Sequence, residues 1–231
     1  MDIRIDKMLA AATGLSRKEA RALIKAGLVG MKGETVKDIG AKVSGGVTLR
    51  GLPLEYSDKV YYMLNKPKGI LSAGRDKNRE TVVDIIANET GRKGLFPVGR
   101  LDKDTTGLLL ITNDGDFSHK VISPKSGIVK EYIVTLDGAV TSEVIEGFEK
   151  GVTLADGTVC LSAKLEILSE NTCKCSIMEG KYHQIKRMFG VYALGVNELE
   201  RVKIGRLCLD EKLKSGEYKE LSSDQIKRIF E

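Results

Sequence analysis

The sequence lacks the residues and motifs on which most cofactor-dependent enzymes rely. Its 231 residues include no tryptophan, two histidines and four cysteines. The cysteines form no C-x-x-C pair, so neither a zinc site nor a disulfide framework is expected, and the thiols are expected to be reduced. They are Cys160, Cys173, Cys175 and Cys208. The common nucleotide motifs G-x-x-x-x-G-K-S/T and G-x-G-x-x-G are also missing. We therefore expect no metal and no cofactor.

Long apolar runs are missing as well. No stretch approaches the roughly 18 apolar residues that mark a membrane span, and the first residues contain no apolar signal core. The apolar content of 42% is ordinary for a folded globular protein. These features predict a cytoplasmic protein that does not act at a membrane.

Positive charge is concentrated at the start of the chain. Residues 1–59 carry 11 Lys and Arg against 7 Asp and Glu, whereas the remainder carries 26 against 25. A small basic segment beside a nearly neutral one suggests affinity for a polyanion, most simply a nucleic acid. Residues 51–58 break the periodicity of the chain and contain one of its four prolines. The sequence therefore predicts two domains, 1–59 and 60–231.

The first segment begins with two predicted helices. Apolar residues at helical spacing predict a helix over residues 3–12, and a capping box at residues 16–19 starts a second helix that ends at Gly27. Four basic residues lie on or beside one face of the second helix: Arg17, Lys18, Arg21 and Lys25. Such a stripe is also typical of a solvated helix surface.

A predicted hairpin over residues 28–36 and a short strand over 43–49 complete the segment. With the two helices, it resembles the S4 RNA-binding domain through residues 4–10, 16–20 and 23–27. The resemblance implies an S4-like α/β fold. It also implies that the four basic side chains bind structured RNA, mainly through phosphates.

After residue 59 the pattern changes to strands. Alternating or short apolar runs predict strands over 60–65, 95–98, 108–111, 130–136, 152–154, 159–161, 164–167, 172–178, 201–204 and 219–221. Helical patterns predict helices over 81–87, 117–122, 141–150, 182–191 and, after a capping box at 222–225, to residue 230. The many consecutive strands predict an α+β domain with a mixed, mainly antiparallel sheet flanked by helices.

The stretch 99–115 begins with a charged loop between the strands predicted over 95–98 and 108–111, and it ends in a turn signal at 113–115. At its mouth, a strand end holds Asp102 between the basic residues Arg100 and Lys103. Taken alone, the stretch favours a plain turn in which Asp102 and Asp104 only shape the backbone. The strand residue Tyr132 and the basic run 179–189 change this balance. Chemistry on a base in RNA needs an aromatic ring, cations for phosphates and one reactive carboxylate.

Four motifs in this segment resemble those of pseudouridine synthases: 63–69, 99–115, 130–132 and 180–189. Residues 205–210 and 216–218 match the ribosomal small-subunit pseudouridine synthase A branch. The resemblance implies that Asp102 is the catalytic carboxylate, acting as a nucleophile or as a base. It also implies roles for three other residues. Lys186 forms an ion pair with Asp102, Tyr132 stacks on the target uracil, and Arg100 assists in displacing the target base from its helix.

Three further basic residues are expected to bind RNA. Lys66 and Lys68 flank Pro67, directly after the predicted strand that ends at residue 65, and Arg187 lies on the predicted basic helix. Residues 189–196 and 72–79 depart from the branch's usual pattern, so the resemblance predicts the reaction but does not specify the target nucleotide.

The expected function is site-specific isomerisation of uridine to pseudouridine in 16S ribosomal RNA. We expect a monomer whose substrate is a small-subunit assembly intermediate. One alternative is a pseudouridine synthase that acts on 23S ribosomal RNA. The other is a non-catalytic RNA-binding factor in ribosome assembly, for which the S4-like segment alone would suffice.

Overall fold

The computed structural model describes residues 3–54 and 59–231, and the chain divides into two units, Met1–Lys59 and Val60–Glu231. Part of the predicted boundary stretch, residues 55–58, lies outside the described residues. Its earlier part is not a linker, because Leu52–Leu54 forms strand β4. Pro53 is tolerated there because β4 is an edge strand.

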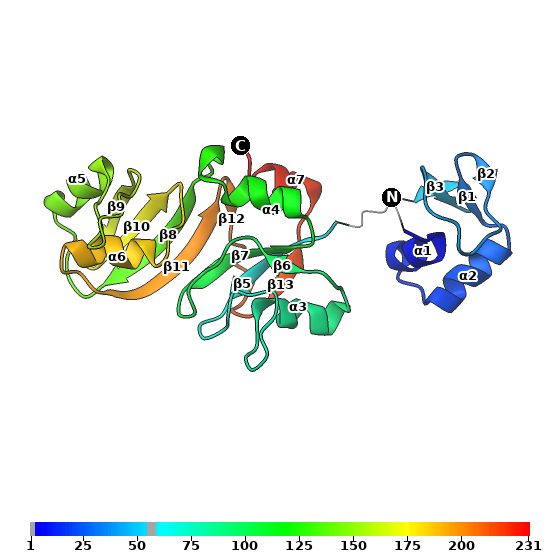
Figure 1. Ribbon diagram of the computed structural model, residues 1–231, viewed down its shortest axis with the longest axis horizontal. Coiled ribbons are helices and arrows are strands. Elements are labelled where there is room, and N and C mark those ends of the chain that lie inside the picture. The colour runs from blue at the N-terminus through cyan, green and yellow to red at the C-terminus, as the bar shows by residue number, and fades with distance from the viewer. Residues whose placement is uncertain (1–2, 55–58) are drawn as a thin grey trace. The chain divides into compact units, whose positions relative to one another are not determined.

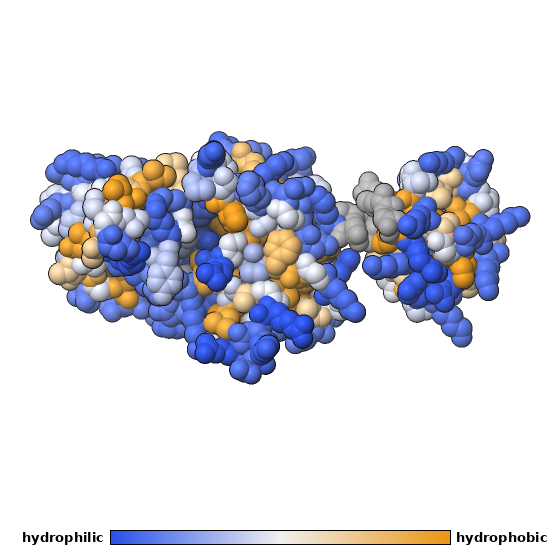
Figure 2. All heavy atoms as spheres, viewed as in Figure 1, coloured by the Kyte–Doolittle hydropathy of each residue, from blue (hydrophilic) through white to orange (hydrophobic). Residues whose placement is uncertain are grey.

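The first unit packs two helices with a small antiparallel sheet. The helices are α1 (Ile5–Thr13) and α2 (Arg17–Lys25), and the sheet, in the order β2-β1-β3-β4, consists of β1 (Val29–Met31), β2 (Glu34–Thr35), β3 (Val47–Leu49) and β4 (Leu52–Leu54). The predicted capping box of α2 is formed, with the Ser16 N–H donating to Glu19 Oε2 over 2.9 Å. Apolar residues of both helices and the sheet form one core, and Figure 2 shows hydrophilic side chains gathered over the two helices.

One large mixed sheet organises the second unit. Its path is β13-β5-β7-β11-β8-β10-β9, with β6 paired to β7 and β12 to β11. The strands are β5 (Tyr61–Lys66), β6 (Phe96–Pro97), β7 (Thr106–Thr112), β8 (Lys130–Leu136), β9 (Lys164–Ser169), β10 (Thr172–Ile177), β11 (Val196–Ile204), β12 (Leu207–Cys208) and β13 (Tyr218–Glu220). All their pairings are antiparallel except that of β7 with β11. The predicted α+β class with a mainly antiparallel sheet is confirmed.

Helices cover both faces of this sheet. They are α3 (Val82–Thr90), α4 (Gly115–Ile122), α5 (Ser142–Lys150), α6 (Gln184–Val191) and α7 (Ser223–Lys227), with a 3-10 turn at Pro124–Ser126. Figure 1 shows α3 and α4 on opposite sides of β5 and β7, and α5 and α6 beside β9 and β10. None of the helices in the described parts of the chain is long and apolar enough to cross a bilayer.

The apolar run at 108–111 forms the middle of the sheet and is buried on both faces. Leu109 and Ile111 belong to the core shared with α3, whereas Leu108 and Leu110 belong to the core shared with α4. A continuous apolar run of this length is what a strand buried on both faces requires. The charged stretch that precedes it is therefore anchored to the most buried strand of the unit.

Two of the predicted strands are not formed, and a third begins earlier than predicted. Residues 152–154 and 159–161 form a loop with a single bridge between Thr153 and Val159 rather than two strands, although Val152, Leu154 and Cys160 are buried. Strand β11 begins at Val196, before the predicted start at residue 201. Register shifts between 196 and 198 and between 201 and 203 interrupt its alternation, so the period of two is not visible in the sequence.

Candidate active site

The loop that carries Asp102 runs between β6 and β7. The segment that follows β5 forms hydrogen bonds with the backbone of this loop. The Gly69 N–H donates to Lys103 O over 2.7 Å. The Ser72 hydroxyl donates to Leu101 O over 2.8 Å and accepts from the Leu101 N–H over 3.2 Å. These bonds fix the backbone on both sides of Asp102, whose side chain is 24% exposed.

Lys66 belongs to this support, so the prediction that it binds RNA is wrong. Its side chain is fully buried, and its Nζ donates to the backbone oxygens of Pro67, Lys103 and Thr105 over 3.0, 3.2 and 3.0 Å. Burial lowers the pKa of Lys66 to about 8. Lys68 is exposed, and its contact with RNA stays a prediction.

Two nitrogen-bearing side chains, one from α6 and one from the turn before it, face Asp102. Lys186 Nζ lies 3.6 Å from Asp102 Oδ2, and His183 Nε2 lies 3.5 Å from Asp102 Oδ1. Lys186 is closer to Asp104, whose Oδ1 accepts its hydrogen bond over 2.6 Å. This bond holds the pKa of Asp104 below its usual value. Lys186 therefore bridges two aspartates, and Asp104 does more than shape the loop.

His183 is a site residue for which the sequence predicted no role. It precedes α6 in the left-handed region, with φ of 47°, and its ring stacks on Tyr182 with centroids 3.9 Å apart. Its place in the basic run 179–189 is the only signal in the sequence, and that signal favours no particular function. Among the described residues, no group of three or more His, Cys, Asp or Glu side chains is placed to hold a metal ion.

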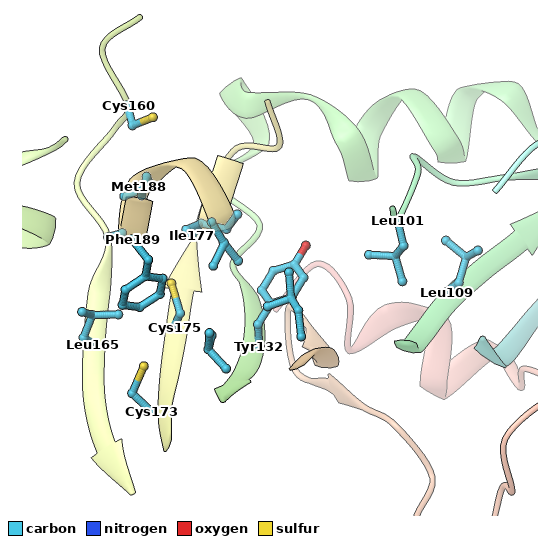
Figure 3. Packing of buried hydrophobic residues seen from close by; sticks show 14 of the residues in the cluster. Leu101, Leu109, Tyr132, Cys160, Leu165, Cys173, Cys175, Ile177, Met188 and Phe189 are labelled. Carbon is cyan, nitrogen blue, oxygen red and sulfur yellow. The ribbon is translucent and has the colours of Figure 1, made fainter. Parts of the chain in front are cut away.

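Tyr132 and Asp102 line the same cavity. This recess has a volume of about 60 Å³, and Arg100, Ile177 and Leu199 also contribute to its walls. Tyr132 is 7% exposed, and Figure 3 shows its ring between Ile177 and Leu101. A second cavity of about 830 Å³ shares Arg100 and Asp102 with the recess and forms an outer groove. The predicted catalytic and stacking residues therefore line one recess, which adjoins the groove at Arg100 and Asp102.

The two predicted arginines of this region differ in their surroundings. Arg100 is exposed and lines both the recess and the groove. Arg187 forms an ion pair with Asp156 over 2.5 Å and donates to Tyr182 O over 3.3 Å. An RNA phosphate would have to compete with Asp156, so the RNA contact of Arg187 stays a prediction.

In the first unit, two arginines of the basic stripe and Arg4 surround a buried carboxylate. Asp6 on α1 is fully buried. Its carboxylate oxygens accept hydrogen bonds from the guanidinium groups of Arg17 over 2.7 Å, Arg21 over 2.8 Å and Arg4 over 3.2 Å. Burial raises the pKa of Asp6, but hydrogen bonds from Arg21, Arg17 and Arg4 outweigh it and hold the pKa well below its usual value. The three arginines remain 43–49% exposed, so the site keeps an excess of positive charge at the surface.

Comparison with known proteins identifies both units. The model of the RNA pseudouridylate synthase family matches residues 60–190, and the S4 domain model matches residues 3–49. The chain belongs to the pseudouridine synthase family. The ribosomal small subunit pseudouridine synthase A of Vibrio cholerae is 38% identical, with 99% of this chain and 100% of that protein covered.

Other members of the pseudouridine synthase family agree with this assignment. The ribosomal large subunit pseudouridine synthase B of Bacillus subtilis is 37% identical over 98% of this chain and 95% of its own length. A crystal structure of a pseudouridylate synthase matches 98% of this chain and 99% of its own, with a TM-score of 0.69 and 35% identity. The protein is thus an RNA pseudouridine synthase with an S4 domain, and the expectation that it is a pseudouridine synthase enzyme is confirmed.

Proposed function

We propose that the protein converts a specific uridine of 16S ribosomal RNA to pseudouridine, with Asp102 as the catalytic carboxylate. The observation that carries the proposal is the recess that Asp102 and Tyr132 share. A uracil ring stacked on Tyr132 in this recess would meet the carboxylate. The full-length similarity to a small subunit synthase supports the choice of 16S RNA.

The reaction is an isomerisation. The bond from ribose C1′ to uracil N1 breaks, the ring turns, and C1′ joins C5; C5 loses its proton and N1 gains one, so no other reactant is needed. Asp102 acts on the ribose as a nucleophile or as a base. Lys186, 3.6 Å from the carboxylate, offsets its negative charge. Arg100 lies exposed at the rim, where it assists displacement of the base and contacts phosphate.

The Asp102→Asn variant tests the catalytic role, with Asp104→Asn as its matched control on the same loop. The first variant should bind RNA as the wild type does and form no pseudouridine, whereas the second should retain product formation. Measurable product from Asp102→Asn would refute the role given to Asp102.

Mapping of pseudouridine in ribosomal RNA tests the substrate. RNA from cells lacking the protein should lose one modification in 16S RNA, and the purified protein should restore it. We propose a monomer that acts in the cytoplasm on an assembly intermediate, so this particle should be modified faster than naked RNA or the finished subunit. Sedimentation of the purified protein tests its monomeric state.

A site in 23S RNA is the second candidate, favoured by the similarity to a large subunit synthase. Loss of a 23S modification in the same mapping experiment would replace the 16S assignment. A non-catalytic assembly factor is disfavoured by membership in the enzyme family. It would be revived if the protein formed no product on any of the three substrates.

A further inference from the structure

One aromatic side chain near the active site, that of Tyr182, is exposed to solvent and contributes to no hydrophobic core of the described residues. Tyr182 is 72% exposed, and it is the most exposed of the described tyrosine and phenylalanine side chains. A large aromatic ring in water forgoes the burial that usually stabilises such residues, which suggests a binding role.

The ring of Tyr182 is held in place before any ligand arrives. It stacks on the imidazole of His183 with centroids 3.9 Å apart and an angle of 16° between the planes. The turn that carries both rings is fixed by Gln184, whose Oε1 accepts from the Lys181 N–H over 2.9 Å and whose Nε2 donates to Glu179 over 2.9 Å. Glu179 is itself buried. One face of the Tyr182 ring is therefore occupied by His183, and the side chain remains largely open to solvent.

The position of the two stacked rings points to a nucleotide as the ligand. His183 Nε2 is 3.5 Å from Asp102 Oδ1, so Tyr182 lies one imidazole ring away from the catalytic carboxylate. Both rings line the outer groove together with the basic residues Arg100 and Lys181. Aromatic rings beside cations are the usual means of binding unpaired bases and their phosphates.

We propose that the open face of Tyr182 stacks on the base of a nucleotide adjacent to the target uridine, while His183 supports the ring from behind. The target uracil occupies the recess of Tyr132, and its neighbour lies at the mouth of that recess, on Tyr182. The enzyme therefore selects RNA in which one base beside the target is unpaired. The inference rests on pseudouridine synthesis in ribosomal RNA and is independent of which subunit is modified.

Variants of the full-length protein test the protein side of this contact. Loss of one base–aromatic stack weakens binding by about fivefold to a hundredfold, so Tyr182→Ala should raise the Kd for substrate RNA by that factor. Tyr182→Phe should stay within about twofold of the wild type because it keeps the ring. Tyr182→Leu, which keeps bulk without the ring, should behave as Tyr182→Ala. The slope of affinity against salt should not change, because no phosphate contact is removed.

An abasic nucleotide on either side of the target uridine tests the RNA side. At one of the two positions it should weaken wild-type binding as much as Tyr182→Ala does, and it should weaken the binding of Tyr182→Ala no further. Unchanged affinity of Tyr182→Ala, or losses that add at both positions, would overturn the inference. Product formed by the wild type on the intact RNA is measured in parallel, so failure of the stacking contact is distinguished from failure of the proposed activity. Equal urea midpoints of unfolding exclude a merely structural effect of the substitutions.

Discussion

Substitution of Lys66 by methionine tests whether the buried lysine supports the loop that carries Asp102 or binds RNA. Methionine keeps most of the length of the side chain and removes the three hydrogen bonds to Pro67, Lys103 and Thr105. Each hydrogen bond to a charged group contributes about 1.5–3 kcal/mol. Removal of the buried ammonium group offsets part of the loss, because its desolvation costs several kcal/mol. We expect a net loss of about 3–5 kcal/mol in the free energy of unfolding, because three backbone oxygens are left without this donor at a cost of about 1–3 kcal/mol each.

Urea unfolding followed by far-UV circular dichroism measures this loss. With a slope of about 2 kcal/mol per molar urea, the midpoint of the second unit should fall by about 1.5–2.5 M. Lys68→Met is the matched control, since Lys68 is exposed two residues away. It should leave the midpoint unchanged and weaken RNA binding, with a smaller salt slope. A Lys66→Met protein with the wild-type midpoint and a reduced salt slope would refute the reasoning.

Two further substitutions test close contacts in the two units. Gly107→Ala should lower stability by about 2–5 kcal/mol in urea unfolding, because φ is 93° and the new methyl group would lie 2.3 Å from Arg201 O; a wild-type midpoint would contradict this clash. Asp6→Asn should destabilise the first unit by about 2 kcal/mol, because it weakens the hydrogen bonds from the arginines. The loss is no larger because water can partly solvate the half-exposed arginines. Because the pKa of Asp6 is depressed in the folded state, its contribution is present at neutral pH and is lost as the pH falls below about 4. The wild-type first unit should therefore lose stability in that range, and the Asp6→Asn protein should lose less. Parallel acid titrations of the two proteins by circular dichroism measure this difference, and equal losses of stability would contradict it.

The sequence predicts the neighbourhood of Asp102 well because that neighbourhood depends on local patterns. The apolar run 108–111 indicates a strand, the charged residues before it indicate a loop, and the alternation around Tyr132 indicates a second strand. Motif resemblance then predicts that these segments meet. The structure places Asp102 and Tyr132 in one recess.

The role of Lys66 could not be predicted because it depends on a single position in register. The sequence predicts that the strand ends at residue 65, before Pro67, which would leave Lys66 and Lys68 as equivalent loop residues. In the structure β5 includes Lys66, which pairs with Gly107 of β7. That pairing places its side chain under the loop, where backbone oxygens replace the water that a surface lysine would bind.

Asp6 and His183 were missed for a related reason. Each becomes significant only through packing between elements that the sequence treats separately. The carboxylate of Asp6 on α1 meets arginines of α2. The ring of His183 reaches the loop before β7. Neither distance follows from a periodic pattern or from spacing along the chain.

The two aspartates of the loop before β7, Asp102 and Asp104, differ in solvation, and this difference suggests how Lys186 is used. Asp104 is 59% exposed and holds Lys186 at 2.6 Å, whereas Asp102 is 24% exposed and lies 3.6 Å away. Charges attract more strongly as water is excluded, and a bound nucleotide would exclude water from the recess of Asp102 rather than from the exposed Asp104. We therefore expect Lys186 to lie closer to Asp102 in the RNA complex. The loop backbone is already held by Lys66, so this adjustment needs only a side-chain movement and keeps the carboxylate fixed for reaction.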